Sequence, residues 1–349
     1  MRNRIVQEDL EKIIGSDLPW LEFEGRTVLI SGANGFLPAY MVETLLALNE
    51  ERLTRRVKVI GLVRDGQRAL TRLGEYVGKG DLRLIVEDVC KPFSIDERVD
   101  YVVHAASQAS PKYYGVDPVG TLSANVLGTH NMLSIAHDHR AKGFMFFSSG
   151  EVYGQVTEDR IPTREDWYGY MDPTDLRSCY GESKRLGETM CVSWFHQYGV
   201  PAKIVRPFHT YGPGMRLDDG RVFADFVADI LNGRDIVMKS DGSARRAFCY
   251  LADAVLGFFT VLLRGQDGQA YNIGNDRAEV SVLELAQRLV ALFPEKGLKV
   301  VQKEGTVVSG YVGSRISRSC PDISKARSLG WEPQTSIEVG FTRTIRSFG

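Results

Sequence analysis

Short apolar runs rich in β-branched residues alternate with longer segments in which apolar residues recur at helical spacing, beginning near Arg26. Such runs predict buried strands, and the segments between several of them predict helices. The first unit reads as strand, Gly-rich turn and helix in TVLISGANGFLPAYMVETLLALN. Further strands are predicted in VKVIGLV (57–63), LRLIVEDV (82–89), DYVVHAAS (100–107), GFMFFSS (143–149) and AKIVRPF (202–208).

This alternation predicts an α/β fold with a doubly wound parallel sheet, because parallel strands need crossover connections of about a dozen or more residues. Ligands of such sheets bind beyond the carboxyl ends of the strands. After about residue 210 the alternation gives way to Gly-, Asp- and Arg-rich stretches, which favour a smaller C-terminal lobe. No Pro/Ser-rich linker separates the two parts, so we expect a shared interface with a cleft.

The chain is therefore divided into an N-terminal arm (1–24), a nucleotide-binding domain (25–210) and a second lobe (211–349) with an interleaved boundary. Within the arm, a short helix is expected from Val6 to Ile14, followed by a polar turn at 15–17.

Composition and charge narrow the class of protein. The chain has 43 Lys and Arg against 44 Asp and Glu, and this balance argues against a nucleic-acid partner. The longest apolar stretch, 254–263, is shorter than the roughly 20 residues that cross a bilayer. Acidic residues at 8 and 9 argue against a secretory signal, so we expect a cytoplasmic protein without a membrane partner. The five cysteines show no C-x-x-C pair and predict neither disulfides nor a metal site.

The Gly-rich turn Gly32-Ala33-Asn34-Gly35 lies between a predicted strand and a predicted helix. There, bare backbone approaches a pyrophosphate and the helix N-terminus supplies N–H donors, as in Rossmann-type folds. Pro38 occupies the position of the usual third glycine, and proline is compatible with a first helical turn.

The residues after the second and third strands leave the cofactor preference open. An acidic residue for the adenosine ribose is usual after the second strand, but the chain has Arg64. Arg64 suits a 2′-phosphate, which favours NADP, and it equally suits stacking on adenine in an NAD site. Asp88, followed by Val89, is a candidate for the adenine amino group.

Tyr180 and Lys184 are four residues apart, so on a helix they share one face. A phenol titrates near about 10, and a neighbouring cation together with a bound nicotinamide ring favours its ionised form. Tyr180 is then a base for a sugar hydroxyl while hydride leaves to the cofactor. Ser149, at the end of the predicted strand 143–149, is expected to hydrogen-bond the same hydroxyl.

These motifs resemble the extended short-chain dehydrogenases of the nucleotide-sugar epimerase and dehydratase group, over about residues 26–345. The resemblance is carried by SGANGF, HAASQASP, SANVLGTHNML, SSGEVYG, YGESK, RPFHTYGPG, RRAFCYLAD, YNIGN and PDISKARSLGW. DWYGYMDPTDLRSCYGESKR and MRLDDGRVFADF are most similar to UDP-glucuronate decarboxylases. These enzymes oxidise the sugar at C4, lose carbon dioxide and reduce the 4-keto intermediate.

The resemblance implies roles for individual residues. Tyr180 is the base, Lys184 its electrostatic partner and ribose anchor, Ser149 orients substrate, and Glu151 acts next to the ketone. NAD is the implied cofactor, held by Gly32, Asn34, Gly35, Phe36, Leu37, Arg64, Asp88, Val89, Ala105, Ala106, Asn125, Tyr180 and Lys184. A nucleotide-diphosphate sugar, expected to be UDP-linked, is held by Ser107, Gln108, Ser110, His209, Arg221 and Arg246. Glu151, Arg221 and Arg246 are alternatively structural or surface charges.

Two positions depart from the pattern of the family. Dehydratases have Asp, and decarboxylases Ser, where this chain has Gly150, so dehydration by the usual acid is disfavoured. His209 replaces the Asn of most relatives, and an imidazole can carry charge near neutral pH, so it either contacts the sugar or is a packed core histidine.

The leading hypothesis is UDP-glucuronate decarboxylation, with 4-epimerisation or simple C4 oxidation or reduction as the alternative. A non-catalytic nucleotide sensor is a minor alternative, disfavoured because Ser149, Tyr180 and Lys184 are all present. By resemblance, the helices around Tyr180 and 125–136 pair in a homodimer, although their apolar faces equally suit packing within one subunit.

Overall fold

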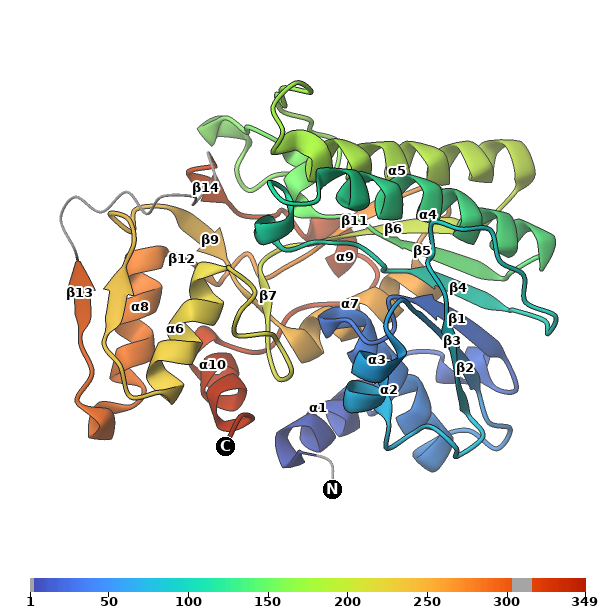
Figure 1. Ribbon diagram of the computed structural model, residues 1–349, viewed down its shortest axis with the longest axis horizontal. Helices are drawn as coiled ribbons and strands as arrows, with labels where there is room; N and C mark the ends of the chain where they lie inside the picture. The colour runs from blue at the N-terminus through green and yellow to red at the C-terminus, as the bar shows by residue number, and fades with distance from the viewer. Residues whose placement is uncertain (1–2, 303–315) are drawn as a thin grey trace.

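The fold centres on a sheet of seven parallel strands in the order β11-β6-β5-β4-β1-β2-β3 (Figure 1). The computed structural model describes residues 3–302 and 316–349. The strands are β1 (Thr27–Ser31), β2 (Lys58–Val63), β3 (Leu82–Val86), β4 (Tyr101–His104), β5 (Gly143–Phe147), β6 (Ala202–Pro207) and β11 (Ala270–Ile273). All six strands predicted from the apolar runs are present, and the doubly wound α/β class is confirmed. The seventh strand, β11, comes from the C-terminal part of the chain.

Helices cover both faces of the sheet, as the predicted class requires. On one face lie α4 (Pro118–Asp138) and α5 (Ser178–Tyr198) side by side, and on the other α2 (Phe36–Glu51) and α7 (Leu251–Arg264) (Figure 1). Side chains of β5 alternate between the two faces of the sheet. Phe144 and Phe146 pack in the cluster with α4 and α5. Met145 and Phe147 pack in the cluster with α2 and α7. A short helix, α3 (Gly66–Leu73), follows β2. Within the described parts of the chain, no helix is long and apolar enough to span a membrane.

The N-terminal segment is packed into the core rather than appended to it. Helix α1 (Arg4–Ile14) lies against α2 and α7, and a 3₁₀ turn, η1 (Trp20–Phe23), follows it. The apolar residues of α1 are spaced so that one face is buried: Val6, Leu10, Ile13 and Ile14. This face gives the sheet an additional helical layer on one side.

The second lobe is built from helices and short strands after residue 210. Its helices are α6 (Val222–Leu231), α8 (Val282–Ala291), α9 (Ser324–Arg327) and α10 (Ile337–Arg346). Its strands are β7 (Thr210–Tyr211), β8 (Ile236–Met238), β9 (Arg245–Ala247), β10 (Cys249–Tyr250), β12 (Glu279–Ser281), β13 (Val300–Gln302) and β14 (Arg318–Ser319).

One hydrophobic cluster runs through both parts of the molecule. The rings of Tyr211 and Phe341 stack 3.8 Å apart, and Phe248 packs edge-on against both. The same cluster continues through α7 to α2 and the sheet. Because α7 and β11 belong to the sheet layer although they follow residue 210, the two lobes are interleaved.

Candidate functional site

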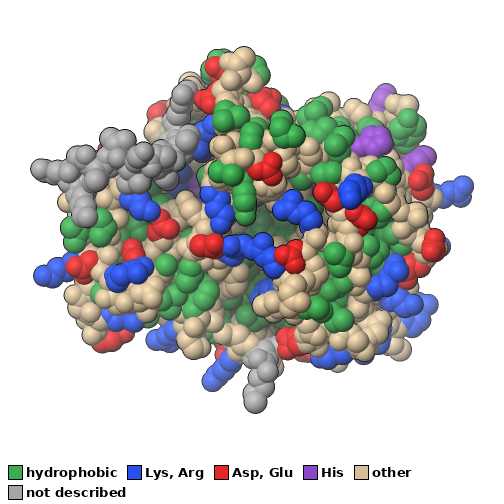
Figure 2. Space-filling model, in the orientation of Figure 1, with side chains coloured by type: hydrophobic (Ala, Val, Ile, Leu, Met, Phe, Trp, Pro, Cys, Tyr) green, Lys and Arg blue, Asp and Glu red, His purple; other side chains and the backbone are tan. Residues whose placement is uncertain are grey.

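A cleft of about 1090 Å³ runs from the carboxyl ends of the sheet strands to the second lobe. Figure 2 shows a hollow near the centre of one face, with basic and acidic side chains at its rim. Most of the residues predicted from the sequence line this cleft: Gly32, Asn34, Gly35, Phe36, Leu37, Arg64, Asp88, Val89, Ala105, Ala106, Ser107, Gln108, Ser149, Glu151, Tyr180, Lys184, His209, Arg221 and Arg246.

Two predicted residues, Ser110 and Asn125, are not among the residues that line the cleft. Ser110 donates its hydroxyl hydrogen to the backbone oxygen of Asp219. Asn125 is fully buried on α4, and its amide donates to the hydroxyl of Ser183 on α5 at 2.9 Å. In this structure both side chains connect elements of the cleft wall to one another.

The Gly-rich turn brings backbone to the floor of the cleft. Gly32 has φ +66°, and a Cβ there would lie 2.8 Å from the Cα of Ala106, so only glycine fits. Gly35 caps the N-terminus of α2, where free N–H groups and the helix dipole favour an anion. Pro38 lies in the first turn of α2, as the sequence predicted. This arrangement fits the pyrophosphate of a dinucleotide.

The wall opposite the turn is fixed by hydrogen bonds behind β4. The Ser31 hydroxyl oxygen accepts the backbone N–H groups of Ala105 and Ala106 at 3.1 and 3.2 Å and lies 2.7 Å from Nδ1 of His104. Since that oxygen already accepts two N–H groups, its own hydrogen is directed to Nδ1. Burial, aided by the charge of Lys184, lowers the pKa of His104 to about 3, so the imidazole is neutral.

The adenosine end of the cleft combines one cation with two carboxylates. Arg64 and Asp88 line it, as predicted, and so does Glu87, which the sequence analysis did not single out. Asp88 accepts the backbone N–H of Cys90 at 2.9 Å, which lowers the pKa of its carboxyl. Asp65 is the N-cap of α3. Its carboxylate accepts the backbone N–H of Arg68 at 3.0 Å and so stabilises the start of that helix.

Tyr180 and Lys184 lie on one face of α5, and the end of β5 meets them there. The Lys184 ammonium donates to the backbone oxygen of Phe147 at 2.6 Å, and the Ser149 hydroxyl hydrogen-bonds the Tyr180 phenol. Burial raises the pKa of Tyr180 to about 12, while Ser149 and the charge of Arg221 act to lower it. Burial lowers the pKa of Lys184 to about 7. The predicted base, cation and hydroxyl are therefore brought together.

A second tyrosine belongs to the site although no motif indicated it. The ring of Tyr114 stacks on that of Tyr180, with centroids 5.2 Å apart and planes 16° from parallel. The guanidinium of Arg177 lies 5.9 Å from the Tyr114 ring centroid, and both residues line the cleft. They come from the loop before α4 and from the N-cap of α5, and only the tertiary fold joins them.

Glu151 lies in the cleft close to Ser149 and Tyr180. It belongs to the 3₁₀ turn η3 (Gly150–Tyr153), whose N-cap is Ser149, and its backbone N–H donates to Ser149 Oγ at 3.2 Å. Its charge acts on both Tyr180 and Tyr114, raising the pKa of each. A Cβ at Gly150 would come within 3.1 Å of the Phe208 ring, so a larger residue there requires that ring to shift.

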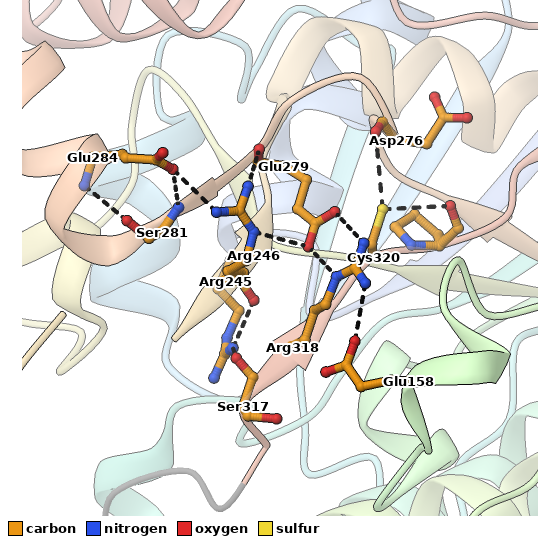
Figure 3. Close-up of polar contacts among 11 residues, drawn as sticks. Glu158, Arg245, Arg246, Asp276, Glu279, Ser281, Glu284, Ser317, Arg318 and Cys320 are labelled. Atoms are coloured by element: carbon orange, nitrogen blue, oxygen red, sulfur yellow. Dashed lines mark hydrogen bonds and ion pairs between the residues drawn. The ribbon is translucent and has the colours of Figure 1, made fainter. Parts of the chain in front are cut away.

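The second lobe supplies a basic wall. Arg246, on β9, donates to the backbone oxygens of Arg245 and Ser317 (Figure 3). It also donates to the backbone oxygen of Ile316. Beside it, Arg318 is held by both carboxylate oxygens of Glu279 (Figure 3). These contacts hold β9 and β14 together at the cleft edge.

Two buried polar atoms in the cleft lack a partner among the described residues, Ser107 Oγ and His209 Nδ1. Burial and the charges of Arg246 and Arg221 hold the pKa of His209 well below its usual value, so its ring is neutral. Arg221 itself pairs with Asp219 at 3.0 Å. Because buried polar groups normally have partners, these atoms fit a polar ligand in the cleft.

The fold and the site together define a nucleotide-binding α/β protein with a Tyr/Lys/Ser catalytic constellation. A family model described as the NAD dependent epimerase/dehydratase family matches residues 28–274. The chain belongs to this family of enzymes, and the resemblance inferred from the motifs is confirmed.

Curated relatives include UDP-glucuronic acid decarboxylase 3 of Arabidopsis thaliana, 36% identical over 315 residues, which are 90% of this chain and 86% of the relative. UDP-glucuronic acid decarboxylase 1 of Danio rerio is 33% identical over 94% of this chain and 73% of its own length.

Solved structures of similar fold include UDP-glucose 4-epimerase from Thermotoga maritima, with a TM-score of 0.76, 24% identity and coverage of 92% and 98% of the two chains. UDP-glucuronic acid 4-epimerase from Bacillus cereus, in complex with UDP-glucuronic acid and NAD, has a TM-score of 0.74, 22% identity and coverage of 92% and 98%.

Proposed function

We propose that this protein decarboxylates UDP-glucuronate with bound NAD. The observation that carries the proposal is the gathering of Ser149, Glu151, Tyr180 and Lys184 in one cleft, with Gly150 in place of a dehydratase acid. UDP-glucuronic acid decarboxylases of Arabidopsis thaliana and Danio rerio are similar to this chain over 90% and 94% of its length.

The cleft residues have distinct tasks in this reaction. Tyr180 takes the proton of the sugar C4 hydroxyl, Ser149 orients that hydroxyl, and the Lys184 cation stabilises the phenolate. When bound, NAD would supply the acceptor and later the donor of the C4 hydride. Oxidation at C4 makes the substrate a β-keto acid, whose carboxylate leaves as carbon dioxide. Loss of carbon dioxide leaves an enolate whose C5 must take up a proton, and we assign Glu151 to that proton transfer.

Gly150 separates this proposal from dehydration. Expulsion of water from a sugar needs a proton donor, and Gly150 has no side chain. A Cβ at this position would lie 3.1 Å from the Phe208 ring, so an acidic side chain there would require that ring to shift. Loss of carbon dioxide needs no such donor.

Arg177 supports a substrate with a carboxylate. It lies beside Tyr114, whose ring stacks on the catalytic Tyr180, and it lines the same cleft. A guanidinium binds a carboxylate through paired N–H groups. We therefore assign Arg177 to the hexuronate carboxylate, with Arg221 and Arg246 assigned to the diphosphate.

We also propose NAD rather than NADP as the cofactor. Glu87 and Asp88 line the adenosine end of the cleft, and carboxylates there disfavour an additional phosphate. The cation of Arg64 favours that phosphate, so the preference between NAD and NADP depends on the balance between Arg64 and the two carboxylates. Calorimetric titration with NAD and with NADP decides it, and tighter binding of NADP would reverse the assignment.

A homodimer is proposed through α4 and α5, which lie side by side on the outer face of the molecule (Figure 1). Exposed apolar side chains from both helices populate this surface: Leu122, Leu127, Leu186, Val192 and Phe195. Exposed apolar side chains on two adjacent helices favour association. Light scattering on the purified protein tests it, and a mass of about 39 kDa, that of one chain, would contradict it.

The reaction is tested by mass spectrometry of the purified protein incubated with UDP-glucuronate and NAD, alongside other nucleotide sugars. Conversion of UDP-glucuronate to a product lighter by carbon dioxide is expected. A product of unchanged mass but altered stereochemistry would establish a 4-epimerase instead, and net gain or loss of two hydrogens a C4 oxidoreductase.

A further inference from the structure

Three consecutive residues at the end of β5 hold three residues spaced four apart on α5. Phe147 accepts from Lys184, Ser148 donates to Glu188, and Ser149 hydrogen-bonds Tyr180. The first and third of these contacts involve the catalytic groups. The middle contact, between Ser148 Oγ and Glu188 Oε1 at 2.5 Å, is buried and has no part in the chemistry described above.

Glu188 is itself held rigidly from β6. Nε and Nη2 of Arg206 donate to its two carboxylate oxygens at 2.8 and 2.6 Å, in a bidentate pair. The Arg206 side chain is 1% exposed and also donates to the hydroxyls of Tyr153 and Tyr168 and to the backbone oxygen of Glu165. Such a network fixes the carboxylate in position and orientation.

Glu188 lies behind the active site and not in it. Together with Arg206 it lines a separate cavity of about 990 Å³, whereas Lys184 and Ser148 line the cofactor cleft. A carboxylate placed there does not touch the substrate or the cofactor. Its effect on the reaction must therefore pass through Ser148 and Lys184.

We propose that Glu188 is a positioning residue, which fixes the end of β5 through Ser148 and places its carboxylate one helical turn from Lys184 on α5. This inference rests on the proposed use of Tyr180 and Lys184 in catalysis. Three successive contacts fix the end of β5 against α5. They keep the Ser149 hydroxyl, the Tyr180 phenol and the Lys184 ammonium in position relative to one another.

The charges around Lys184 determine whether loss of the Glu188 charge raises or lowers the pKa of Lys184. Burial lowers the pKa of Lys184 to about 7, and the negative charge of Glu188 acts against this. The titratable and charged groups facing the pair are Cys191 on α5, His104 on β4, Arg206 on β6 and Tyr153 on η3. Replacing Glu188 by a neutral amide leaves the Arg206 cation without its partner, so Lys184 loses its proton at lower pH.

Two variants separate the two effects. Glu188→Gln removes the charge and is expected to move the alkaline limb of the kcat–pH profile to lower pH. Ser148→Ala keeps the Glu188 and Arg206 pair and is expected to lower kcat roughly tenfold with KM nearly unchanged, because a misplacement of about 1 Å costs up to about a hundredfold. The matched control is Glu182→Gln, on the same helix and paired with Arg185 at 3.2 Å, which is expected to leave the pH profile unchanged.

Melting temperatures of all three variants show whether folding is affected, and Ser148→Ala remains informative if Glu188→Gln is unstable. An unshifted pH profile in folded Glu188→Gln, or wild-type kcat in Ser148→Ala, overturns the proposal. The same variants are titrated with NAD across pH, because Lys184 is assigned to the cofactor ribose. A pH-dependent loss of NAD affinity in Glu188→Gln supports the inference even if UDP-glucuronate proves not to be the substrate.

Discussion

Burial controls the protonation of the ionisable side chains around the cleft. Burial raises the pKa of Tyr180 and lowers the pKa of Lys184. It also lowers the pKa values of His104 and His209, so both imidazoles are neutral. Each of these groups is moved away from its ordinary pKa by the same cause, the low-dielectric interior at the strand ends. Their charges then depend on a few neighbours, which makes single substitutions informative.

Tyr180→Phe removes the hydroxyl to which we assign the role of base and leaves the ring stacked on Tyr114. We expect kcat to fall by roughly 10²- to 10⁴-fold, the usual contribution of a general base, with NAD affinity retained. Steady-state kinetics and calorimetry measure the two quantities. Tyr198→Phe, at the exposed end of the same helix, is the control. Undiminished turnover by the Tyr180 variant would refute its assignment as the base.

The buried neutral state of His209 predicts that stability falls in mild acid. The unfolded chain binds a proton at this histidine below about pH 6.5 whereas the folded chain does not, so the free energy of unfolding decreases by up to about 1.4 kcal/mol per pH unit for this group. The contribution of His209 to stability is therefore complete above about pH 6.5 and is lost progressively below it, down to the lowered pKa of the folded state. His209→Asn is expected to flatten this slope in urea unfolding measurements, and the exposed His196→Asn is not. Equal slopes in wild type and His209→Asn would contradict the prediction.

At the scale of elements, α1 depends on one buried carboxylate. Asp9 accepts from the hydroxyls of Tyr40 and Tyr250 at 3.0 and 2.7 Å and from Arg343 at 2.8 Å, which ties α1 to α2, β10 and α10. Burial raises the pKa of Asp9 despite these donors. Helix α1 is thus joined to both lobes at one point.

Asp9→Ala is expected to lower the free energy of unfolding by roughly 2–3 kcal/mol, since hydrogen bonds to a charged group contribute about 1.5–3 kcal/mol. Glu8→Ala, which removes a more exposed carboxylate that also pairs with Arg343, is expected to cost much less. Chemical denaturation of both variants makes the comparison. Equal losses would show that α1 is held by its apolar face alone.

Elements that are defined by short stretches of sequence could be predicted, whereas contacts between distant segments could not. The strands from β1 to β6 and the helices α1, α2, α4 and α5 follow from apolar runs and periodicity within short windows. Strand β11 was not predicted as a strand, because its four residues, Ala270–Ile273, include the polar Asn272 and form no continuous apolar run. Tyr114, Arg177 and Glu188 had no motif to mark them because only tertiary contacts bring them to the site, whereas Tyr180 and Lys184 share one helix face.

For the whole molecule, the cleft is lined by residues of both lobes, and the proposed function assigns a dinucleotide to one end of it and the UDP group to the other. The Gly-rich turn and α2 belong to the sheet layer, and Arg246 belongs to β9 of the second lobe. Each site stabilises the fold when occupied, by about 2.7 kcal/mol at a ligand concentration one hundred times Kd. The two contributions are separable because the residues that carry them are separate.

Gly32→Ala is expected to abolish the rise in melting temperature on adding NAD, since its Cβ would lie 2.8 Å from the Cα of Ala106 and the backbone has φ +66°. The rise on adding UDP is expected to remain in that variant, because Arg246 and its carbonyl partners are unchanged. Arg246→Met should give the reverse pattern. Thermal shift measurements with each ligand alone complete the test. Loss of both responses in either variant would mean that the lobes do not bind their nucleotides independently, and that the cleft forms only when both parts of the molecule are correctly packed.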